Sequence, residues 1–378
     1  MKKIGVGFVG YGMIGRVHAL AYRELGHYYP GTLPTVELAG VCTTRTETAE
    51  RAATEAGIRF WTSRVEELVN ERSVDVIDCC APNELHYSVA MAAIQAGKPV
   101  IIEKPLAVTA GQADEIAQAA QKAGVTVGMI FNYRFIPAIM HARQLIEEGF
   151  LGKVYQFQIE YLHTGYQNRE RPMGWKLRRA QSGGGALVDL GSHLIDLTRY
   201  LLGDFDRVLA TTQTFITQRP TNPGSTQMEP VDVDDAGWLQ IRLASGAVGT
   251  LMATRFATGA VDDLNLLVHG ERGAIRFNLT EPNWLWIYDQ RTAGEPYGGR
   301  RGWTRVESVQ TYPGAAVPPA RSFLGWTRPM AQNLYAFLSA VAQNRELVPS
   351  VADGLAVQRV ISAAYASAQK NQWQEVDR

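Results

Sequence analysis

A chain of 378 residues is longer than most single domains, so its length predicts two of them. Lysine plus arginine and aspartate plus glutamate number 37 each, and this balance, without a basic block, disfavours nucleic acid and anionic membranes as partners. No apolar run approaches the ~20 residues of a membrane-spanning helix. Glycines interrupt the apolar amino terminus, which therefore reads as a first strand rather than a signal peptide.

The three cysteines, Cys42, Cys79 and Cys80, all fall at the ends of predicted apolar strands. Two are adjacent and none has the spacing of a CxxC motif, so neither a disulfide framework nor a metal site is expected. Small buried thiols of this kind are typical of a reducing compartment. We therefore expect a cytoplasmic protein without a bound metal ion.

The first third of the chain alternates between short apolar runs and helical stretches. Helices are expected over 46–56, 84–96 and 110–123, each followed by a glycine at the next position. Short, uniformly apolar strands that alternate with helices predict parallel βαβ units. The strands are expected at 4–10, 36–42, 74–80, 99–103 and 125–131, and they predict a first domain over residues 1–131.

From residue 132 onward the pattern changes to longer strands with alternating polarity. A helix over 137–148 precedes them, a Ser245-Gly246 turn joins two of them, and helices over 328–343 and 353–370 follow. The segment 290–325 is expected to be a long loop, either functional or disordered. The second domain, residues 132–378, is thus predicted to be α/β with a large open mixed, mostly antiparallel sheet, and its C-terminal helix could pack back on the first domain. The strands are expected at 154–162, 208–217, 236–243, 247–255, 264–269 and 284–288.

A glycine motif, Gly10-Tyr-Gly12-Met13-Ile14-Gly15, stands between the first strand and the first helix. Gly10 permits a tight turn, Gly12 lets the backbone approach a pyrophosphate, and Gly15 lets the helix pack close to the strand. The helix amino terminus then offers N–H groups and a positive dipole to the phosphates. A plain glycine turn is the alternative, but the strand–turn–helix context favours a dinucleotide site that includes Met13 and Ile14.

Two further loops leave the carboxyl edge of the predicted parallel sheet, where ligands bind in doubly wound folds. The first loop, Ala81-Pro82-Asn83, follows the strand at 74–80 and could contact the cofactor. The alternative is that Asn83 merely caps the following helix. The second loop is Glu103-Lys104-Pro105, for which a surface Glu–Lys pair is the alternative to a functional site. We expect the Lys104-Pro105 peptide bond to be cis. The residues expected at the nicotinamide cleft are Ala81, Pro82, Asn83, His86, Glu103 and Lys104.

The choice of cofactor depends on the end of the second strand, where NAD-preferring domains place an aspartate or glutamate. This chain has Thr43, Thr44 and Arg45 there, a set suited to the 2′-phosphate of NADP. The alternative is that Thr44 caps the helix that begins near Thr46, with Arg45 in solvent. We predict NADP or NAD as the cofactor, with NADP slightly favoured.

The segment 183–203, GGGALVDLGSHLIDLTRYLLG, predicts a buried helix that begins after its three glycines, which suggest close approach of another backbone or a ligand. Asp189 and His193 are four residues apart, so they would lie one turn apart on its flank. Either they form a hydrogen-bonded pair that holds the helix in place, or they are part of a catalytic site. The apolar stripe of the helix consists of Leu187, Leu190, Leu194, Leu197 and Leu201.

Together these motifs resemble the glucose–fructose oxidoreductase/inositol dehydrogenase (Gfo/Idh/MocA) family along the whole chain. The resemblance implies a Rossmann domain followed by the open-sheet domain, a substrate site between the two, and a homodimer or homotetramer formed through that sheet. It also implies reversible NAD(P)-dependent oxidation of a sugar, anhydrosugar or polyol. The matching segments are GYGMIG at 10–15, APNELH at 81–86, EKP at 103–105, NYR at 132–134, GGALVDLGSHLIDL at 184–197 and VHGERGAIRF at 268–277.

The resemblance also implies roles for individual residues. His193 would be the base, Lys104 would donate a hydrogen bond to the developing alkoxide, and Asp189 would orient the substrate or the imidazole. Two other classes in the family stay open, a redox glycosidase and a non-catalytic regulator, although these three residues argue against the regulator. Substrate contacts are expected from Arg134, His163, Trp175, Asp189 and His193, and a stacking surface for a pyranose could come from Trp284, Trp286, Trp303 and Trp326.

Overall fold

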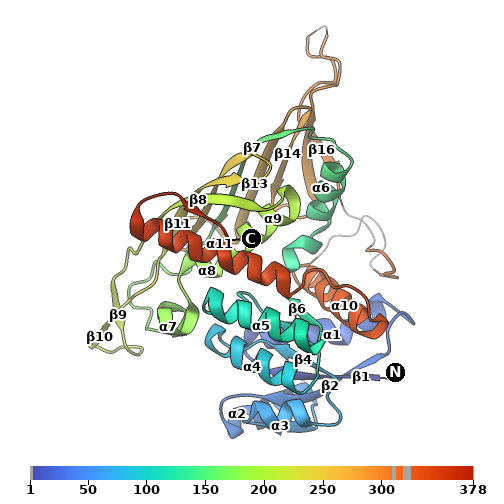
Figure 1. The fold of residues 1–378 in the computed structure, drawn as a ribbon, viewed down its shortest axis with the longest axis vertical. Coiled ribbons are helices and arrows are strands. Elements are labelled where there is room, and N and C mark those ends of the chain that lie inside the picture. Colours follow the sequence, from blue (N-terminus) through green and yellow to red (C-terminus); the bar gives the residue numbers. More distant parts are fainter. Residues whose placement is uncertain (1–2, 296, 309–311, 318–324, 378) are drawn as a thin grey trace. The chain divides into compact units, whose positions relative to one another are not determined.

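The computed structural model describes residues 3–295, 297–308, 312–317 and 325–377 (Figure 1). Its contacts divide the chain into two compact units. Unit 1 comprises Met1–Phe135 and Thr311–Gln358, and unit 2 comprises Ile136–Gln310 and Arg359–Arg378. The predicted domain boundary between residues 131 and 132 stays a prediction, and the chain returns to unit 1 near its end.

The sheet of unit 1 is parallel and has the strand order β3-β2-β1-β4-β5-β6. This order, with the reversal between β1 and β4, is that of a Rossmann fold and confirms the predicted fold class. Strand β3 is not predicted from the sequence. The strands are β1 (Lys3–Val9), β2 (Thr35–Cys42), β3 (Phe60–Thr62), β4 (Val76–Cys79), β5 (Val100–Ile102) and β6 (Val127–Met129).

Helices cover this sheet, and α2 and α5 have the predicted bounds. Both end at a glycine with positive φ, Gly57 (65°) and Gly124 (65°). Helices α4 and α5 lie side by side (Figure 1), and α10 packs on α1 in one apolar cluster. The helices are α1 (Met13–Tyr28), α2 (Thr46–Ala56), α3 (Val65–Asn70), α4 (Asn83–Gln95), α5 (Ala110–Ala123), η1 (Asn132–Phe135) and α10 (Thr327–Gln343).

The large sheet of unit 2 has the order β16-β15-β14-β13-β7-β12-β11-β8-β17. Its neighbours run antiparallel except β7 and β12, so the predicted mixed, mostly antiparallel sheet is confirmed. Gly246 (φ 87°) turns the chain from β11 to β12 as predicted. The strands are β7 (Val154–Leu162), β8 (Phe205–Gln213), β11 (Ala236–Leu243), β12 (Val248–Thr254), β13 (Asp263–Gly270), β14 (Gly273–Asn278), β15 (Trp284–Asp289), β16 (Thr304–Glu307) and β17 (Gln374–Glu375).

Strands β9 (Gln218–Pro220) and β10 (Met228–Pro230) form a separate hairpin in unit 2. These two, with β14, β16 and β17, are not predicted from the sequence. Strand β16 lies within 290–325, so the prediction that this whole segment is a loop is wrong. Part of the segment, 296, 309–311 and 318–324, lies outside the described residues.

The buried helix predicted after the three glycines of 183–203 is wrong as a single element. It is divided into α8 (Ala186–Asp189) and α9 (Gly191–Leu202), with Leu190 between them at φ −100°. Gly185 starts α8 so close to Asp234 that a Cβ there would lie 1.7 Å from the Asp234 carbonyl oxygen. The five leucines of the stripe are nevertheless all buried, as predicted.

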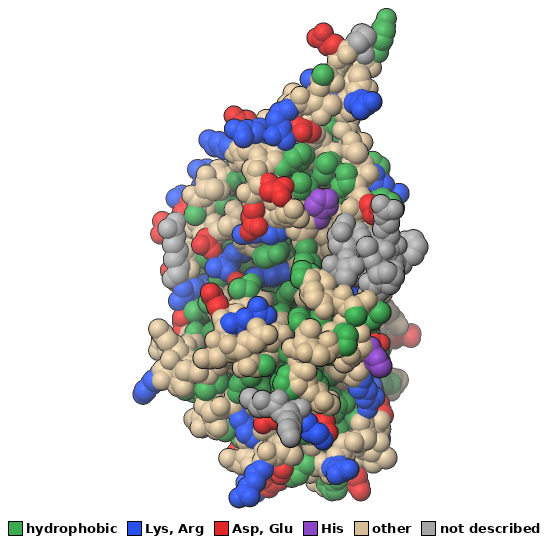
Figure 2. Space-filling view, turned by 90° about the vertical axis from the view of Figure 1, so that its right-hand side faces the viewer, with side chains coloured by type: hydrophobic (Ala, Val, Ile, Leu, Met, Phe, Trp, Pro, Cys, Tyr) green, Lys and Arg blue, Asp and Glu red, His purple; other side chains and the backbone are tan. Residues whose placement is uncertain are grey.

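The remaining helices of unit 2 are α6 (Pro137–Glu147), η2 (Trp175–Leu177) and α7 (Arg179–Ser182), and α11 (Val351–Lys370) begins in unit 1 and ends in unit 2. Within the described residues, no helix combines the length and the apolar character needed to cross a membrane. On the face drawn in Figure 2, basic and acidic side chains are mixed over the described surface, in keeping with the balanced composition.

Candidate active site

The glycine turn between β1 and α1 has the geometry of a phosphate cradle. Gly10 has φ 89° and donates its N–H to Cys42 O at 2.9 Å. A Cβ on Gly15 would lie 2.7 Å from Gly10 O, whereas a Cβ on Gly12 would meet nothing within 4 Å. The first turn of α1 carries no acidic residue and no side-chain cap, so its N–H groups remain available for an anion. These residues fit a dinucleotide pyrophosphate.

The end of β2 lies beside this turn, because Val9 pairs with Cys42. Thr43 donates its hydroxyl to Arg45 O at 3.0 Å, and the side chains of Thr44 and Arg45 are exposed. The alternative that Thr44 caps α2 is wrong, since the N-cap position is Arg45 and no side chain caps it. No carboxylate occupies this strand end, so the position can accept a charged 2′-phosphate as well as a ribose hydroxyl.

The loops after β4 and β5 are tied together by His86. Its buried ring lies 2.7 Å from Pro105 O through Nδ1 and 3.0 Å from Ala81 O through Nε2. Burial lowers the pKa of His86, so the neutral ring is favoured. Pro82 holds the N-cap position of α4, so the alternative that Asn83 merely caps this helix is wrong, and its contact with the cofactor stays a prediction. The Lys104-Pro105 peptide is cis, as predicted.

In unit 2, Asp189 at the end of α8 is held by two cations. Lys176 Nζ lies 3.0 and 3.2 Å from its two carboxylate oxygens, and Arg255 Nη2 lies 3.0 Å from Oδ2. The guanidinium of Arg255 also stacks over the ring of Tyr166 at 4.4 Å. The Asp189 charge raises the pKa of Lys176, although burial opposes the shift. Both neighbours therefore favour the ionised carboxylate.

His193 on α9 faces a second polar group of unit 2. Its ring meets Tyr161 edge-on at 6.0 Å, and Tyr161 meets His163 at 4.9 Å. Asp262 accepts a hydrogen bond from the Tyr161 hydroxyl and lies 3.1 Å from His163 Nε2. Burial alone would raise the pKa of Asp262, but His163, Tyr161 and His193 together lower it. Asp262 also has φ 50°, a left-handed backbone that non-glycine residues seldom adopt outside functional or tight-turn positions.

Comparison with known proteins decides the family. A model of an oxidoreductase family with an NAD-binding Rossmann fold matches residues 4–131, and a Gfo/Idh/MocA C-terminal domain model matches residues 139–276. Levoglucosan dehydrogenase from Pseudarthrobacter phenanthrenivorans is 32% identical to the chain, and the match covers 100% of this chain and 99% of that protein. The chain belongs to the Gfo/Idh/MocA family.

Other relatives agree with this membership. The NADP-dependent scyllo-inositol 2-dehydrogenase of Bacillus subtilis is 28% identical over 97% of this chain and 94% of its own length. A structure of levoglucosan dehydrogenase with NADH and levoglucosan superposes with a TM-score of 0.94 at 32% identity and covers 100% of both chains. This Gfo/Idh/MocA protein is an NAD(P)-dependent oxidoreductase that exchanges hydride between the nicotinamide and a carbon of a sugar or polyol.

The other predicted substrate contacts of this Gfo/Idh/MocA chain lie in varied surroundings. Arg134 is buried in unit 1, where its Nη2 lies 2.9 Å from Asp353 Oδ1. Trp175 begins η2, and the Lys176 ammonium lies 5.6 Å from its ring. The two tryptophans of β15, and Trp303 just before β16, lie under arginines rather than in the core, as with Arg305 over Trp284 at 4.1 Å. Their role towards a sugar stays a prediction.

Sequence reasoning missed Lys176, which pairs with Asp189, and two residues beside strands of unit 2, Arg255 and Asp262. Arg255 directly follows β12 and is almost fully buried, and Asp262 precedes β13. Each is a charged residue at the edge of a predicted apolar strand, and that position is the signal that could have found them.

Proposed function

We propose that this enzyme oxidises a ring hydroxyl of a pyranose-like sugar or anhydrosugar, with Lys104, Asp189 and His193 at the reacting alcohol. The observation that carries the proposal is the full-length similarity to levoglucosan dehydrogenase, combined with an ionised Asp189 one helix break away from His193. A half-buried carboxylate held by two cations is a strong acceptor for sugar hydroxyls.

The proposed roles follow from the chemistry of an alcohol that loses a proton and a hydride. A bound nicotinamide supplies the hydride acceptor. His193 accepts the hydroxyl proton, since imidazole is the side chain that changes charge near neutral pH. Lys104 donates a hydrogen bond to the same oxygen as negative charge develops there. Asp189 remains ionised beside Lys176 and Arg255 and orients a neighbouring hydroxyl, so it is a positioning group rather than the base.

The test is a substrate panel. Purified protein is assayed with levoglucosan, scyllo-inositol and D-xylose, each with NAD⁺ and NADP⁺, while the absorbance of the reduced cofactor is followed. We expect levoglucosan to be oxidised fastest and the His193→Ala variant to be nearly inactive. Wild-type protein that binds cofactor but turns over none of these sugars would refute the proposed substrate class. Release of sugar from a glycoside without net reduction of cofactor would instead identify a redox glycosidase.

We further propose assembly through the open face of the large sheet. Helices α8 and α9 pack on the opposite face, while Gln158, Gln240 and Thr250 line a groove of about 420 Å³ on the open one. Trp238 is 39% exposed there, on the same side of β11 as Gln240. A homodimer or homotetramer would cover this surface. Trp238→Glu should then yield a monomer in sedimentation experiments, whereas an unchanged mass would refute the interface.

The finer assignments of cofactor and location are also proposals. NADP is slightly favoured over NAD, because Thr43, Thr44 and Arg45 stand where an NAD-specific carboxylate would be. A cytoplasmic location is supported by Cys42, Cys79 and Cys80, which are free thiols.

A further inference from the structure

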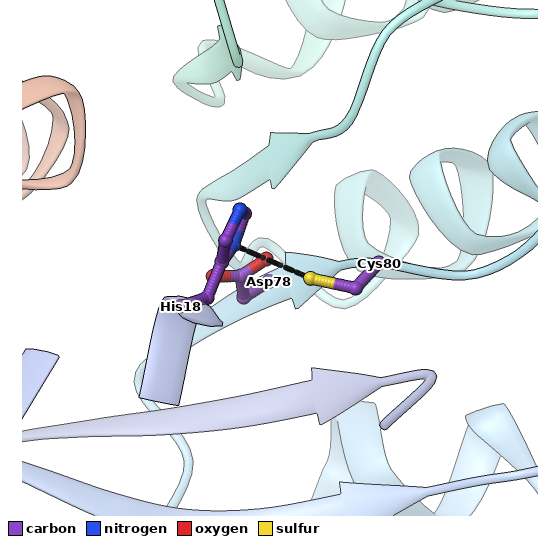
Figure 3. A group of neighbouring side chains, drawn as sticks. All are labelled: His18, Asp78 and Cys80. Atoms are coloured by element: carbon purple, nitrogen blue, oxygen red, sulfur yellow. Dashed lines mark hydrogen bonds and ion pairs between the residues drawn. The ribbon is translucent and has the colours of Figure 1, made fainter. Parts of the chain in front are cut away.

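A group of neighbouring ionisable side chains, His18, Asp78 and Cys80, lies in the interior of unit 1 (Figure 3). His18 on α1 and Asp78 on β4 are both 0% exposed. His18 Nδ1 lies 3.1 and 2.9 Å from the two carboxylate oxygens of Asp78, and Cys80 Sγ lies 3.2 Å from Asp78 Oδ1. On the other side of the ring, His18 Nε2 lies 3.3 Å from Glu103 Oε1, an ion-pair contact that lacks hydrogen-bond geometry.

The geometry of this group is that of an ion pair, because each ring nitrogen of His18 faces a carboxylate. Burial would lower the pKa of His18, but Asp78 and Glu103 outweigh burial and raise that pKa to about 10. A doubly protonated imidazole has no lone pair to give to a metal ion. Burial, followed by the charge of Asp78, also raises the pKa values of the Cys80 thiol and the Tyr22 hydroxyl, so both stay neutral. The charges that face His18 in the described structure are therefore the two carboxylates.

The ion pair reaches the catalytic loop through Glu103. One Glu103 oxygen contacts His18, and the other accepts a hydrogen bond from the Lys104 backbone N–H at 3.1 Å. A continuous line of contacts thus runs from Asp78 through His18 and Glu103 to Lys104. Apolar residues of similar volume often stabilise a core as well as a buried ion pair does. Stability alone therefore gives little reason for charges in a strand otherwise built of Val76, Ile77 and Cys79.

We propose that His18 is a positioning residue for Lys104. Its imidazolium, held by Asp78, fixes the Glu103 carboxylate, and Glu103 in turn fixes the backbone from which the lysine side chain extends. The proposal rests on the proposed function in one respect, the role of Lys104 at the reacting oxygen. It adds a requirement beyond the Glu103-Lys104-Pro105 motif itself, because His18 on α1 must supply a positive charge to that loop.

The first measurement does not depend on turnover. Imidazole nitrogen NMR, with the His18 signals assigned by their loss in His18→Gln, reports which ring nitrogens carry protons. At about pH 8 an unperturbed histidine is neutral, whereas we expect both nitrogens of His18 to be protonated in the wild-type protein. In the Asp78→Asn variant, His18 should lose its positive charge at a lower pH than in the wild-type protein. A His18 that titrates at its ordinary pKa in the wild-type protein would overturn the proposal.

The second measurement separates positioning from stability by means of the double variant His18→Gln/Asp78→Asn. This variant removes both buried charges, so it should regain much of the thermal stability that His18→Gln loses. We nevertheless expect kcat, for the sugar that the panel selects, to stay about 10- to 100-fold below wild type, because the lysine is misplaced. The KM for that sugar and the Kd for NADH should change little. Recovery of kcat together with stability would assign the ion pair a purely structural role and refute the proposal.

A Lys104→Ala variant measured in parallel keeps the two claims apart. If that variant retains wild-type turnover, the proposed role of Lys104 is wrong. If Lys104→Ala is inactive while the stable double variant has wild-type kcat, the role of Lys104 stands and the role of His18 is wrong.

Discussion

The two cations that hold Asp189 differ in exposure, and this difference predicts two different phenotypes. The Arg255 side chain is 2% exposed and that of Lys176 is 40% exposed, although both lie 3.0 Å from the carboxylate. We consider Arg255→Met and Lys176→Met, which remove each charge and keep an unbranched side chain. The exposed Arg169 of the same unit, changed to Met, is the matched control.

Arg255→Met should act mainly on stability. Removing one partner of a buried ion pair costs about 3–5 kcal/mol, and because Lys176 still compensates Asp189, we expect a value near the lower end, about 3 kcal/mol. Lys176→Met breaks a solvent-screened pair and should cost about 1 kcal/mol or less. For kcat/KM we expect the reverse order, with the larger loss in Lys176→Met. Lys176 can share a donor with a substrate hydroxyl, and the loss of a charged hydrogen bond of about 1.5–3 kcal/mol would lower kcat/KM roughly 10- to 100-fold.

Calorimetry is the suitable assay, because two compact units need not unfold in one transition. For a unit of this size, about 3 kcal/mol corresponds to a fall in Tm of roughly 6–12 °C. Arg169→Met should stay within about 0.5 kcal/mol of wild type. Equal losses of Tm for Lys176→Met and Arg255→Met would refute the reasoning, since burial would then not decide the contribution of each pair. An unchanged kcat/KM for Lys176→Met would remove it from the substrate site.

Three further predictions concern the chemistry, the cofactor and the response to acid. Lys104→Ala and His193→Ala should each lower kcat about 100-fold or more while cofactor binding is retained, and near wild-type turnover in either would remove that residue from the mechanism. Arg45→Ala should weaken NADP binding by about 1.5–3 kcal/mol and leave NAD binding unchanged in titrations; equal losses for both would contradict an Arg45 contact with the 2′-phosphate. The pKa of Asp262 is lowered in the folded protein, so its stabilising contribution is present above its ordinary value of 3.8 and is lost as the pH falls through the lower folded value. Asp262→Asn should therefore lower Tm at neutral pH and converge with wild type in strong acid, and a difference that persists there would contradict this linkage.

Much of unit 1 could be predicted because its elements carry local signals. Helices such as α2 and α5 end at glycines that adopt positive φ, and glycine is the residue best suited to that backbone. Strand β3 carries no comparable signal, since it has three residues and its Trp61 is exposed. The division of 183–203 could not be predicted either, because Leu190 between the two helices is buried like the rest of the leucine stripe and keeps a right-handed helical backbone.

The residues of the candidate site also fall into two groups: those in short motifs, which could be predicted from the sequence, and those far apart in the chain, which could not. The glycine turn and the Glu103-Lys104-Pro105 loop are short motifs, so their chemistry can be read directly from the chain. Arg255 lies 66 positions from Asp189, and Asp262 lies 99 positions from His163. His18 and Asp78 are 60 positions apart. Such pairs form only when helices and strands from different parts of the chain pack together, and a single sequence contains no local trace of that packing.

Two of the described carboxylates, Asp189 and Glu103, are each paired with cations. This pairing bears on which group of the proposed site can act as the base. Asp189 lies between Lys176 and Arg255, and Glu103 lies beside the charged His18. Each of these cations contacts one or both oxygens of its carboxylate. A carboxylate held in this way is a good acceptor of substrate hydroxyls but a poor reservoir for a proton, because protonation would break its ion pair. Proton transfer is then left to an imidazole, which supports the proposed role of His193 as the base.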